Sequence, residues 1–164
     1  MIAKTGTGKS FKGLTAYLTE EIKQGEILDS VGVRNFSAQV MAFDFHQQAK
    51  INSRTIQSVG HDSLSFSPQD KPMSNEDMKR IALDYMEKMG YVETQFAIIR
   101  HQDRDHQHCH IIYNRVNDHG KCISDKHNYL RANLVCRELE KFYELEQVNG
   151  ERLDKETKRD IFIR

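Results

Sequence analysis

The feature that most constrains the fold is a pair of short apolar runs on either side of a histidine-rich stretch. The sequence over 96–116 reads FAIIRHQDRDHQHCHIIYNRV. Both apolar runs are rich in β-branched and aromatic residues, which is typical of buried strands. The connection between them is short, so we expect two neighbouring strands of an antiparallel sheet.

Four of the eight histidines lie in this stretch, at 101, 106, 108 and 110. Side chains alternate along a strand, so His108 and His110 project to the same side of the sheet. His101 ends the preceding strand, beside this pair. Three imidazoles hold Mn, Co, Ni, Cu or Zn better than Mg or Ca, and three protein ligands leave open positions, as in catalytic sites. The alternative is a hydrophilic turn whose histidines make ordinary hydrogen bonds.

Acidic residues accompany the histidines in the connecting loop. Asp103 or Asp105 is a candidate acceptor for an imidazole N–H, which would fix the tautomer of a ligand. His106 lies within the loop, so we expect it to support the ligands or to contact a phosphate.

The rest of the chain alternates between helical and extended patterns. A serine stands at the expected start of three helices, and glycine or a polar turn ends several elements. We expect helices over 10–25, 37–45, 74–90 and 129–145, and strands over 27–33, 56–66, 96–100 and 108–116. This order predicts an α+β fold with a central antiparallel β-sheet of about five strands flanked by helices.

Length and composition limit the number of domains, the class of protein and its compartment. The 164 residues suit one domain, and 24 Lys+Arg against 24 Asp+Glu exclude a strongly basic coat protein. We expect a domain over 1–148 and a charged C-terminal extension over 149–164, the start of a further region. The three cysteines lack a CxxC spacing, and neither a signal peptide nor a membrane span is evident, which favours a cytoplasmic protein.

Three segments together resemble the conjugative relaxases, the mobilization nucleases of the HUH endonuclease superfamily. HQDRDHQHCHIIYNRV is similar to the third motif of the P-class members, which read HxDxxHxHxH followed by Asn and a basic residue. SFKGLTAYLT resembles their first motif, whose tyrosine cleaves DNA. HDSLSFSPQD resembles the second, a strand with a serine that contacts DNA near the nick, and the matching positions are His61, Ser63, Ser65 and Ser67. The resemblance covers about residues 1–145.

The resemblance implies a role for each matching residue. It assigns His101, His108 and His110 to one divalent metal ion, Mn²⁺ or Mg²⁺ first, with Ni²⁺, Co²⁺ or Zn²⁺ as alternatives. Asp103 would be an acidic partner of these ligands. Tyr17 would be the nucleophile that forms a 5′-phosphotyrosine link, with either Asp103 or His106 as the acceptor of its proton. The candidate DNA contacts, from the resemblance or from charge, are Lys9, Lys12, Ser63, Ser65, Arg104, Asn114 and Arg115, with Arg100 and Arg131 as further basic candidates.

The same resemblance implies partners and a location. The expected substrate is single-stranded DNA at the transfer origin of a plasmid or integrative element in bacteria. An accessory DNA-binding protein and a type IV secretion coupling protein are the expected partners.

Several alternatives stay open at this point. Tyr129 is a rival nucleophile, because replication initiators and transposases of the superfamily carry their tyrosine after the histidines. A mononuclear hydrolase or oxygenase, or a metal-stabilised DNA-binding module, would use the histidines without tyrosine chemistry. The TGTGKS segment invites a phosphate-loop interpretation, but Ala3 stands where that motif needs glycine, so we expect Lys9 and Ser10 at most to hold a DNA phosphate.

Overall fold

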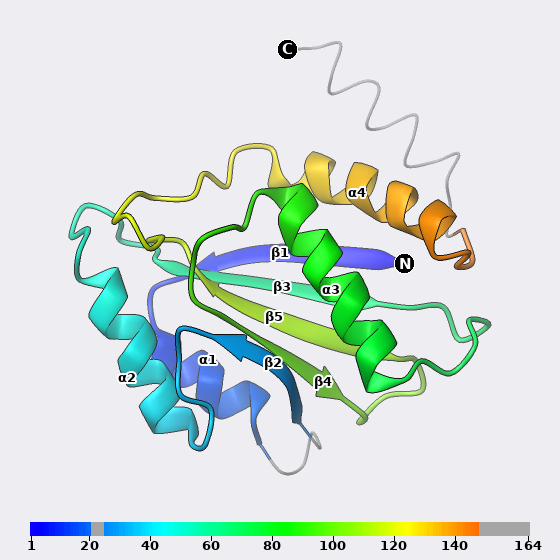
Figure 1. Ribbon diagram of the computed structural model, residues 1–164, viewed down its shortest axis with the longest axis horizontal. Coiled ribbons are helices and arrows are strands. Elements are labelled where there is room, and N and C mark those ends of the chain that lie inside the picture. The colour runs from blue at the N-terminus through cyan, green and yellow to red at the C-terminus, as the bar shows by residue number, and fades with distance from the viewer. Residues whose placement is uncertain (21–24, 148–164) are drawn as a thin grey trace.

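The computed structural model describes residues 1–20 and 25–147. It confirms the expected α+β fold, with five strands and four helices (Figure 1). In chain order the elements are β1 (Ile2–Gly8), α1 (Phe11–Leu18), β2 (Glu26–Val31), α2 (Ala38–Ala49), β3 (Val59–Ser65), α3 (Asn75–Met89), β4 (Phe96–His101), β5 (His108–Asn114) and α4 (Asn128–Phe142). The expected extension over 149–164 lies outside the described residues.

The strands form one sheet in the order β1-β3-β5-β4-β2, and each neighbouring pair is antiparallel. The hairpin partners β4 and β5 lie inside the sheet, where His101 pairs with His108. On the other side of β5, Ser63 of β3 pairs with His110. The histidine strands are therefore held on both edges by main-chain hydrogen bonds, which fixes the relative positions of their side chains.

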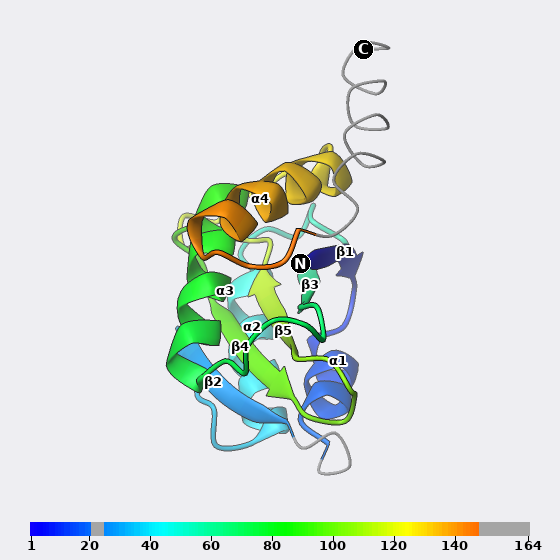
Figure 2. The same ribbon diagram turned by 90° about the vertical axis from the view of Figure 1, so that its right-hand side faces the viewer.

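Two apolar clusters cover the two faces of the sheet. Helices α3 and α4 pack on one face against Leu64, Ile98 and Ile111. Helices α1 and α2 pack on the other face against Ile99 and Ile112 (Figure 2). Because side chains alternate along each strand, this register assigns His101, His108 and His110 to the α1/α2 face.

A buried carboxyl group ties β3 to the helices of the α3/α4 face. The side chain of Asp62 is fully buried and accepts hydrogen bonds from the hydroxyls of Tyr85 (2.7 Å) and Tyr91 (2.8 Å). The Asn128 amide donates to the Tyr91 hydroxyl at 3.1 Å, which extends the network to α4. Burial raises the pKa of Asp62 to about 6, although both hydroxyls favour its carboxylate.

The helix starts agree with the sequence. The hydroxyls of Ser10, Ser37 and Ser74 accept hydrogen bonds from backbone N–H groups of the first turns of α1, α2 and α3. Gly90 ends α3 in the left-handed conformation at φ 80°, where glycine is favoured because it has no Cβ.

The largest differences from the expectation lie in the first two elements of the chain. Strand β1 was not predicted, because its sequence IAKTGTG reads as a turn-rich loop; it is an edge strand that pairs only with β3, where glycine is tolerated. Helix α1 ends at Leu18 rather than near Gly25, with Thr19 as its C-cap.

No helix in the described ranges combines the length and the apolar character needed to cross a membrane.

Candidate metal centre

The three predicted ligands come together at the ends of β4 and β5. One nitrogen from each of His101, His108 and His110 lies within 4.8 Å of the others. The ring centroids are 4.5 Å apart for His101 and His110, 5.4 Å for His101 and His108, and 5.6 Å for His108 and His110. The strand register alone produces this arrangement, since His101 and His108 are direct partners and His110 is two residues further along β5.

Each of these rings makes a hydrogen bond through one defined nitrogen. His101 Nε2 lies 2.7 Å from the Leu18 carbonyl oxygen, and His108 Nδ1 lies 3.3 Å from the His106 carbonyl oxygen. Carbonyl oxygens only accept, so both nitrogens donate and the other nitrogen of each neutral ring carries the lone pair. His110 Nδ1 lies 2.8 Å from Nε2 of His61 on β3. Such contacts fix the tautomer and the orientation of a metal-binding imidazole.

Two imidazoles of the site, His108 and His61, favour the uncharged form. Burial lowers the pKa of His108 below the ordinary value, because the surroundings solvate the imidazolium poorly. Burial also lowers the pKa of His61, and the charge of His101 adds to the effect. A neutral imidazole is the form that binds a metal ion.

Asp103 places a carboxylate beside this cluster. Its Oδ1 lies 3.4 Å from Nε2 of His108, the nitrogen that carries the lone pair when Nδ1 donates to His106. Two electron-rich atoms at this separation favour a bound cation or a proton near them. The three imidazoles therefore fit a divalent transition-metal ion, and the carboxylate of Asp103 lies beside them.

Tyr17 lies on the same side of the sheet as the histidines. It belongs to α1, and its side chain is 51% exposed. The next residue, Leu18, provides the carbonyl group that His101 contacts. Tyr129 lies in the first turn of α4, which packs on the opposite face, so the sheet separates it from the cluster.

The predicted serines also lie on the histidine face. Ser63 pairs with His110 and Ser65 pairs with His108, and both side chains are half-buried. The exposed Lys4 of β1 is the partner of Ser63 on the other side. Polar and basic groups therefore extend from the cluster towards the β1 edge of the sheet.

Asn114 does not occupy a position from which it can contact DNA. It is fully buried, its amide donates to the Phe45 carbonyl and to Gln95 Oε1, both at 2.9 Å, and its Oδ1 accepts from Val116 N–H at 3.0 Å. The reason is its place at the end of β5, on the face that α2 covers. We therefore assign Asn114 a structural role.

The side chain of Arg115 is likewise occupied by hydrogen bonds within the protein. Its guanidinium donates to the carbonyls of Gln57 (2.8 Å) and Ile123 (3.0 Å) and lies 3.3 Å from Asp125. These bonds hold the chain that follows β5 against the loop before β3.

The other basic candidates lie in three places. Arg100 and Arg131 make hydrogen bonds to backbone carbonyls on the α3/α4 side of the sheet. Arg100 donates to Met73 O (2.9 Å) and Arg131 donates to Met89 O (2.5 Å). Lys9 and Lys12 line a pocket of about 500 Å³ between the start of α1 and α2, on the histidine side. Arg104 is exposed in the loop between β4 and β5, and His106 is half-buried there, with its ring centroid 5.3 Å from that of His108.

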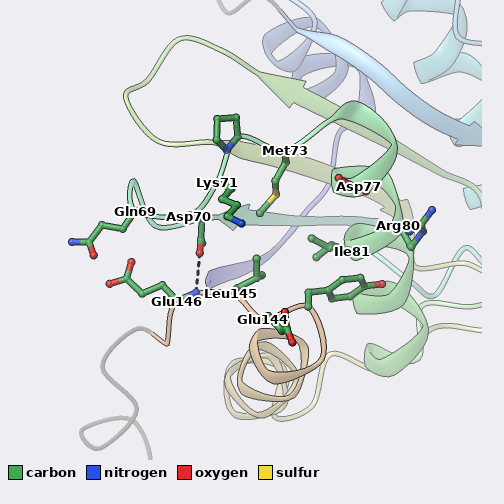
Figure 3. A pocket seen from close by; sticks show the side chains of 12 residues that line it. Gln69, Asp70, Lys71, Met73, Asp77, Arg80, Ile81, Glu144, Leu145 and Glu146 are labelled. Atoms are coloured by element: carbon green, nitrogen blue, oxygen red, sulfur yellow. Dashed lines mark hydrogen bonds between the residues drawn. The ribbon is translucent and has the colours of Figure 1, made fainter.

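A larger pocket of about 640 Å³ lies elsewhere (Figure 3). It is formed by the loop before α3, by α3 itself and by the chain after α4, where Glu146 N–H donates to Asp70 Oδ1 at 2.8 Å. None of the three pockets described, including a third beside the start of α4, is lined by the histidine cluster. The cluster therefore does not belong to any of these cavities.

Sequence reasoning did not identify His61 as a partner of His110. The sequence offers two signals: His61 begins the segment that resembles the second motif, and its even spacing from Ser63 and Ser65 places the three side chains on one face of β3. The pairing of β3 with β5, which brings His61 to His110, is set by tertiary structure and could not be read from the sequence.

A comparison with known families identifies this site's family. Residues 17–145 match the family model described as relaxase, MobA/VirD2-like, nuclease domain. The matched range includes Tyr17 and all three clustered histidines and begins after Lys9 and Lys12. No curated protein matches the chain closely enough to count as a relative.

Proposed function

Because the chain belongs to the relaxase family of MobA/VirD2-like nuclease domains, which nick DNA at transfer origins, we propose that it cuts and rejoins one DNA strand through a covalent link to Tyr17. The intermediate is a 5′-phosphotyrosine, and the reaction requires a divalent metal ion. The target is one strand at a specific site in the transfer origin of a plasmid or other mobile element.

One contact carries this proposal. The helix that bears Tyr17 ends at Leu18, whose carbonyl oxygen lies 2.7 Å from Nε2 of His101. The nucleophile and the metal ligands therefore belong to one connected piece of structure. A phosphate bound near the histidines would lie close to the end of α1.

Both reactants, the phenol of Tyr17 and the DNA phosphodiester, must be activated for this reaction. A phenol hydroxyl is a weak nucleophile at neutral pH, and the phosphodiester anion repels it. When bound, the divalent ion polarises the non-bridging phosphate oxygens and stabilises the charge of the transition state. Asp103, whose carboxylate lies 3.4 Å from His108 Nε2, accepts the phenol proton in our proposal.

The transfer conserves the energy of the broken bond. Tyr17 Oη forms a bond to phosphorus while the bond from phosphorus to O3′ breaks, and the departing oxygen takes up a proton to become a free 3′-hydroxyl. Attack by a 3′-hydroxyl on the phosphotyrosine reverses the step, so joining needs no ATP.

The metal ion is held by His101, His108 and His110. Mn²⁺ or Mg²⁺ is the ion we propose, with Ni²⁺, Co²⁺ and Zn²⁺ as alternatives. Imidazole ligands favour the transition metals over Mg²⁺ on chemical grounds.

The DNA contacts that we propose lie on the histidine side of the sheet. Ser63 and Ser65 contact the strand near the nick, Lys9, Lys12 and Arg104 bind phosphates, and His106 supports His108. The substrate is single-stranded around the nick, because an exposed phosphate must reach Tyr17.

The wider setting is also part of the proposal. The nuclease domain spans 1–148 and works in the bacterial cytoplasm with an accessory DNA-binding protein and a type IV secretion coupling protein. Its three cysteines are free thiols, as expected in a reducing compartment.

The test is to incubate the protein with labelled single-stranded transfer-origin DNA and Mn²⁺ or Mg²⁺. A protein–DNA adduct that resists denaturation supports the proposal, and peptide mapping should place it on Tyr17. A mobility shift without cleavage would indicate a binding module, and neither product would favour a small-molecule enzyme. An adduct on Tyr129 would move the protein to the replication-initiator group.

A further inference from the structure

The fourth histidine of the site, His61, makes a hydrogen bond to a predicted metal ligand. Its Nε2 lies 2.8 Å from Nδ1 of His110, and the two rings stack with centroids 5.1 Å apart and planes inclined by 29°. His61 comes from β3 and His110 from β5, so the contact crosses the strand pair.

Only one nitrogen of a neutral imidazole carries a proton, so the contact has two forms. If His110 offers Nε2 to a metal ion, its Nδ1 keeps the proton and donates to His61 Nε2. His61 then carries its own proton on Nδ1. In the other form, His110 Nδ1 accepts and its Nε2 is protonated, which blocks coordination through that atom.

We propose that His61 is a positioning residue that holds His110 in the tautomer and orientation needed to bind the metal ion. This inference rests on the proposed metal site. His61 itself is not a ligand: the three nitrogens that lie within 4.8 Å of one another come from His101, His108 and His110.

The other two ligands are held in a different way. His101 donates to the Leu18 carbonyl and His108 donates to the His106 carbonyl. Backbone carbonyls fix a tautomer without ambiguity, because they only accept. His110 depends on a side chain for the same purpose, and a substitution at position 61 can therefore test this one ligand alone.

The position of His61 also connects the metal site to the DNA-binding strand. Ser63 and Ser65 follow on the same face of β3, beside His110 and His108. A change at His61 acts on the ligand through one defined bond, whereas a change at either serine leaves that bond intact.

The experiment measures metal binding by the full chain, without DNA. Mn²⁺ affinity is determined by calorimetry, and Co²⁺ is used as a second probe because its visible absorption reports the ligand geometry. His61→Phe removes the acceptor and keeps a ring of similar shape. His61→Gln keeps an acceptor oxygen that can reach His110. His119→Ala is the matched control, since His119 is exposed and bonds to Glu93 away from the site.

We expect His61→Phe to weaken Mn²⁺ binding about 10- to 100-fold, the usual cost of losing a hydrogen-bonding partner of a metal ligand. His61→Gln should recover most of the affinity, and the Co²⁺ spectrum should change in His61→Phe but not in His119→Ala. Affinity and spectrum unchanged in a folded His61→Phe variant would overturn the inference.

Two further outcomes are assigned in advance. If His61→Phe does not fold, His61→Asn replaces it, because the shorter amide loses the same bond while remaining polar, and the expected loss is the same. If the wild-type chain binds neither ion, the proposed metal site is wrong and the role of His61 falls with it. If the wild type binds but no His61 variant differs, only the role of His61 is wrong.

Discussion

The carbonyl oxygen of Leu18 accepts a hydrogen bond of 2.7 Å from Nε2 of His101. This bond joins the last turn of α1 to the end of β4, two elements that are far apart in the sequence. It connects the helix that carries Tyr17 directly to one of the predicted metal ligands.

Tyr17→Phe should abolish the covalent adduct with transfer-origin DNA, because the variant lacks the oxygen that attacks phosphorus. Binding of the same DNA should change less than about threefold, since the ring remains. The adduct is measured on denaturing gels and the affinity by fluorescence anisotropy. Tyr129→Phe is the control and should form the adduct normally; loss of adduct in that variant alone would mean that the nucleophile has been misassigned.

Removing the metal should stop cleavage and lower the thermal stability. A ligand present at about 100 times its dissociation constant stabilises the folded state by roughly 2.7 kcal/mol, so Mn²⁺ should raise the melting temperature and a chelator should reverse the rise. His110→Ala should show little response to Mn²⁺ in the same thermal scan. A response equal to that of the wild type would show that the ion binds elsewhere.

Replacing Lys9 and Lys12 together by alanine should weaken single-stranded DNA binding and reduce its salt dependence. Each phosphate contact contributes about 0.7 to the slope of log affinity against log salt concentration for single strands. The double variant should therefore lose roughly 1.4 units of slope, about 0.7 for each lysine, when measured between low and moderate salt. Lys88→Ala, on α3 and paired with Glu138, should leave the slope unchanged.

Asn114→Ala should destabilise the fold by about 3 kcal/mol, because it leaves buried groups of Phe45, Gln95 and Val116 without their partner. Urea denaturation measures the change. The folded fraction should bind DNA as the wild type does. A variant of normal stability with reduced DNA affinity would contradict the structural role.

Asp62 should make the folded state less stable as the pH rises from about 4 to 6. Its pKa is about 6 when folded against 3.8 for the unfolded group, so the folded state keeps a proton that the unfolded chain has lost. The groups that face it are the hydroxyls of Tyr85 and Tyr91, neither of which titrates in this range because their pKa values are raised.

The measurement compares the wild type with Asp62→Asn by urea denaturation at pH 4 and pH 7.5. Relative to Asp62→Asn, the free energy of unfolding of the wild type should be roughly 3 kcal/mol higher at pH 4 than at pH 7.5. The comparison cancels the other carboxyl groups, which are the same in both proteins. An unchanged difference would mean that the carboxyl is not desolvated.

Much of the site could be predicted from the sequence because its signals are local. The alternation of His108 and His110, and the place of His101 at the end of the preceding run, depend only on strand geometry. The serine caps of α1, α2 and α3 are equally local. The fold class followed from the order of these elements.

The remainder depended on contacts between distant segments. Strand β1 was missed because the sequence KTGTG lacks apolar residues, and pairing with β3 makes it a strand. The burial of Asn114 depends on α2, and the contact of His61 with His110 depends on the pairing of β3 with β5. Neither the partner of a strand nor the helix that covers it is encoded within the segment itself.

Neighbouring residues of β3 serve opposite sides of the molecule, since His61 contacts His110 while Asp62 bonds to Tyr85. Deleting or inserting a single residue at the start of this strand would turn its side chains over, directing a carboxylate at the imidazoles and an imidazole into the apolar interior. Changes of length in this part of the chain are therefore expected to survive only in the loops that flank the strand, and a tolerated one-residue deletion within it would be unexpected.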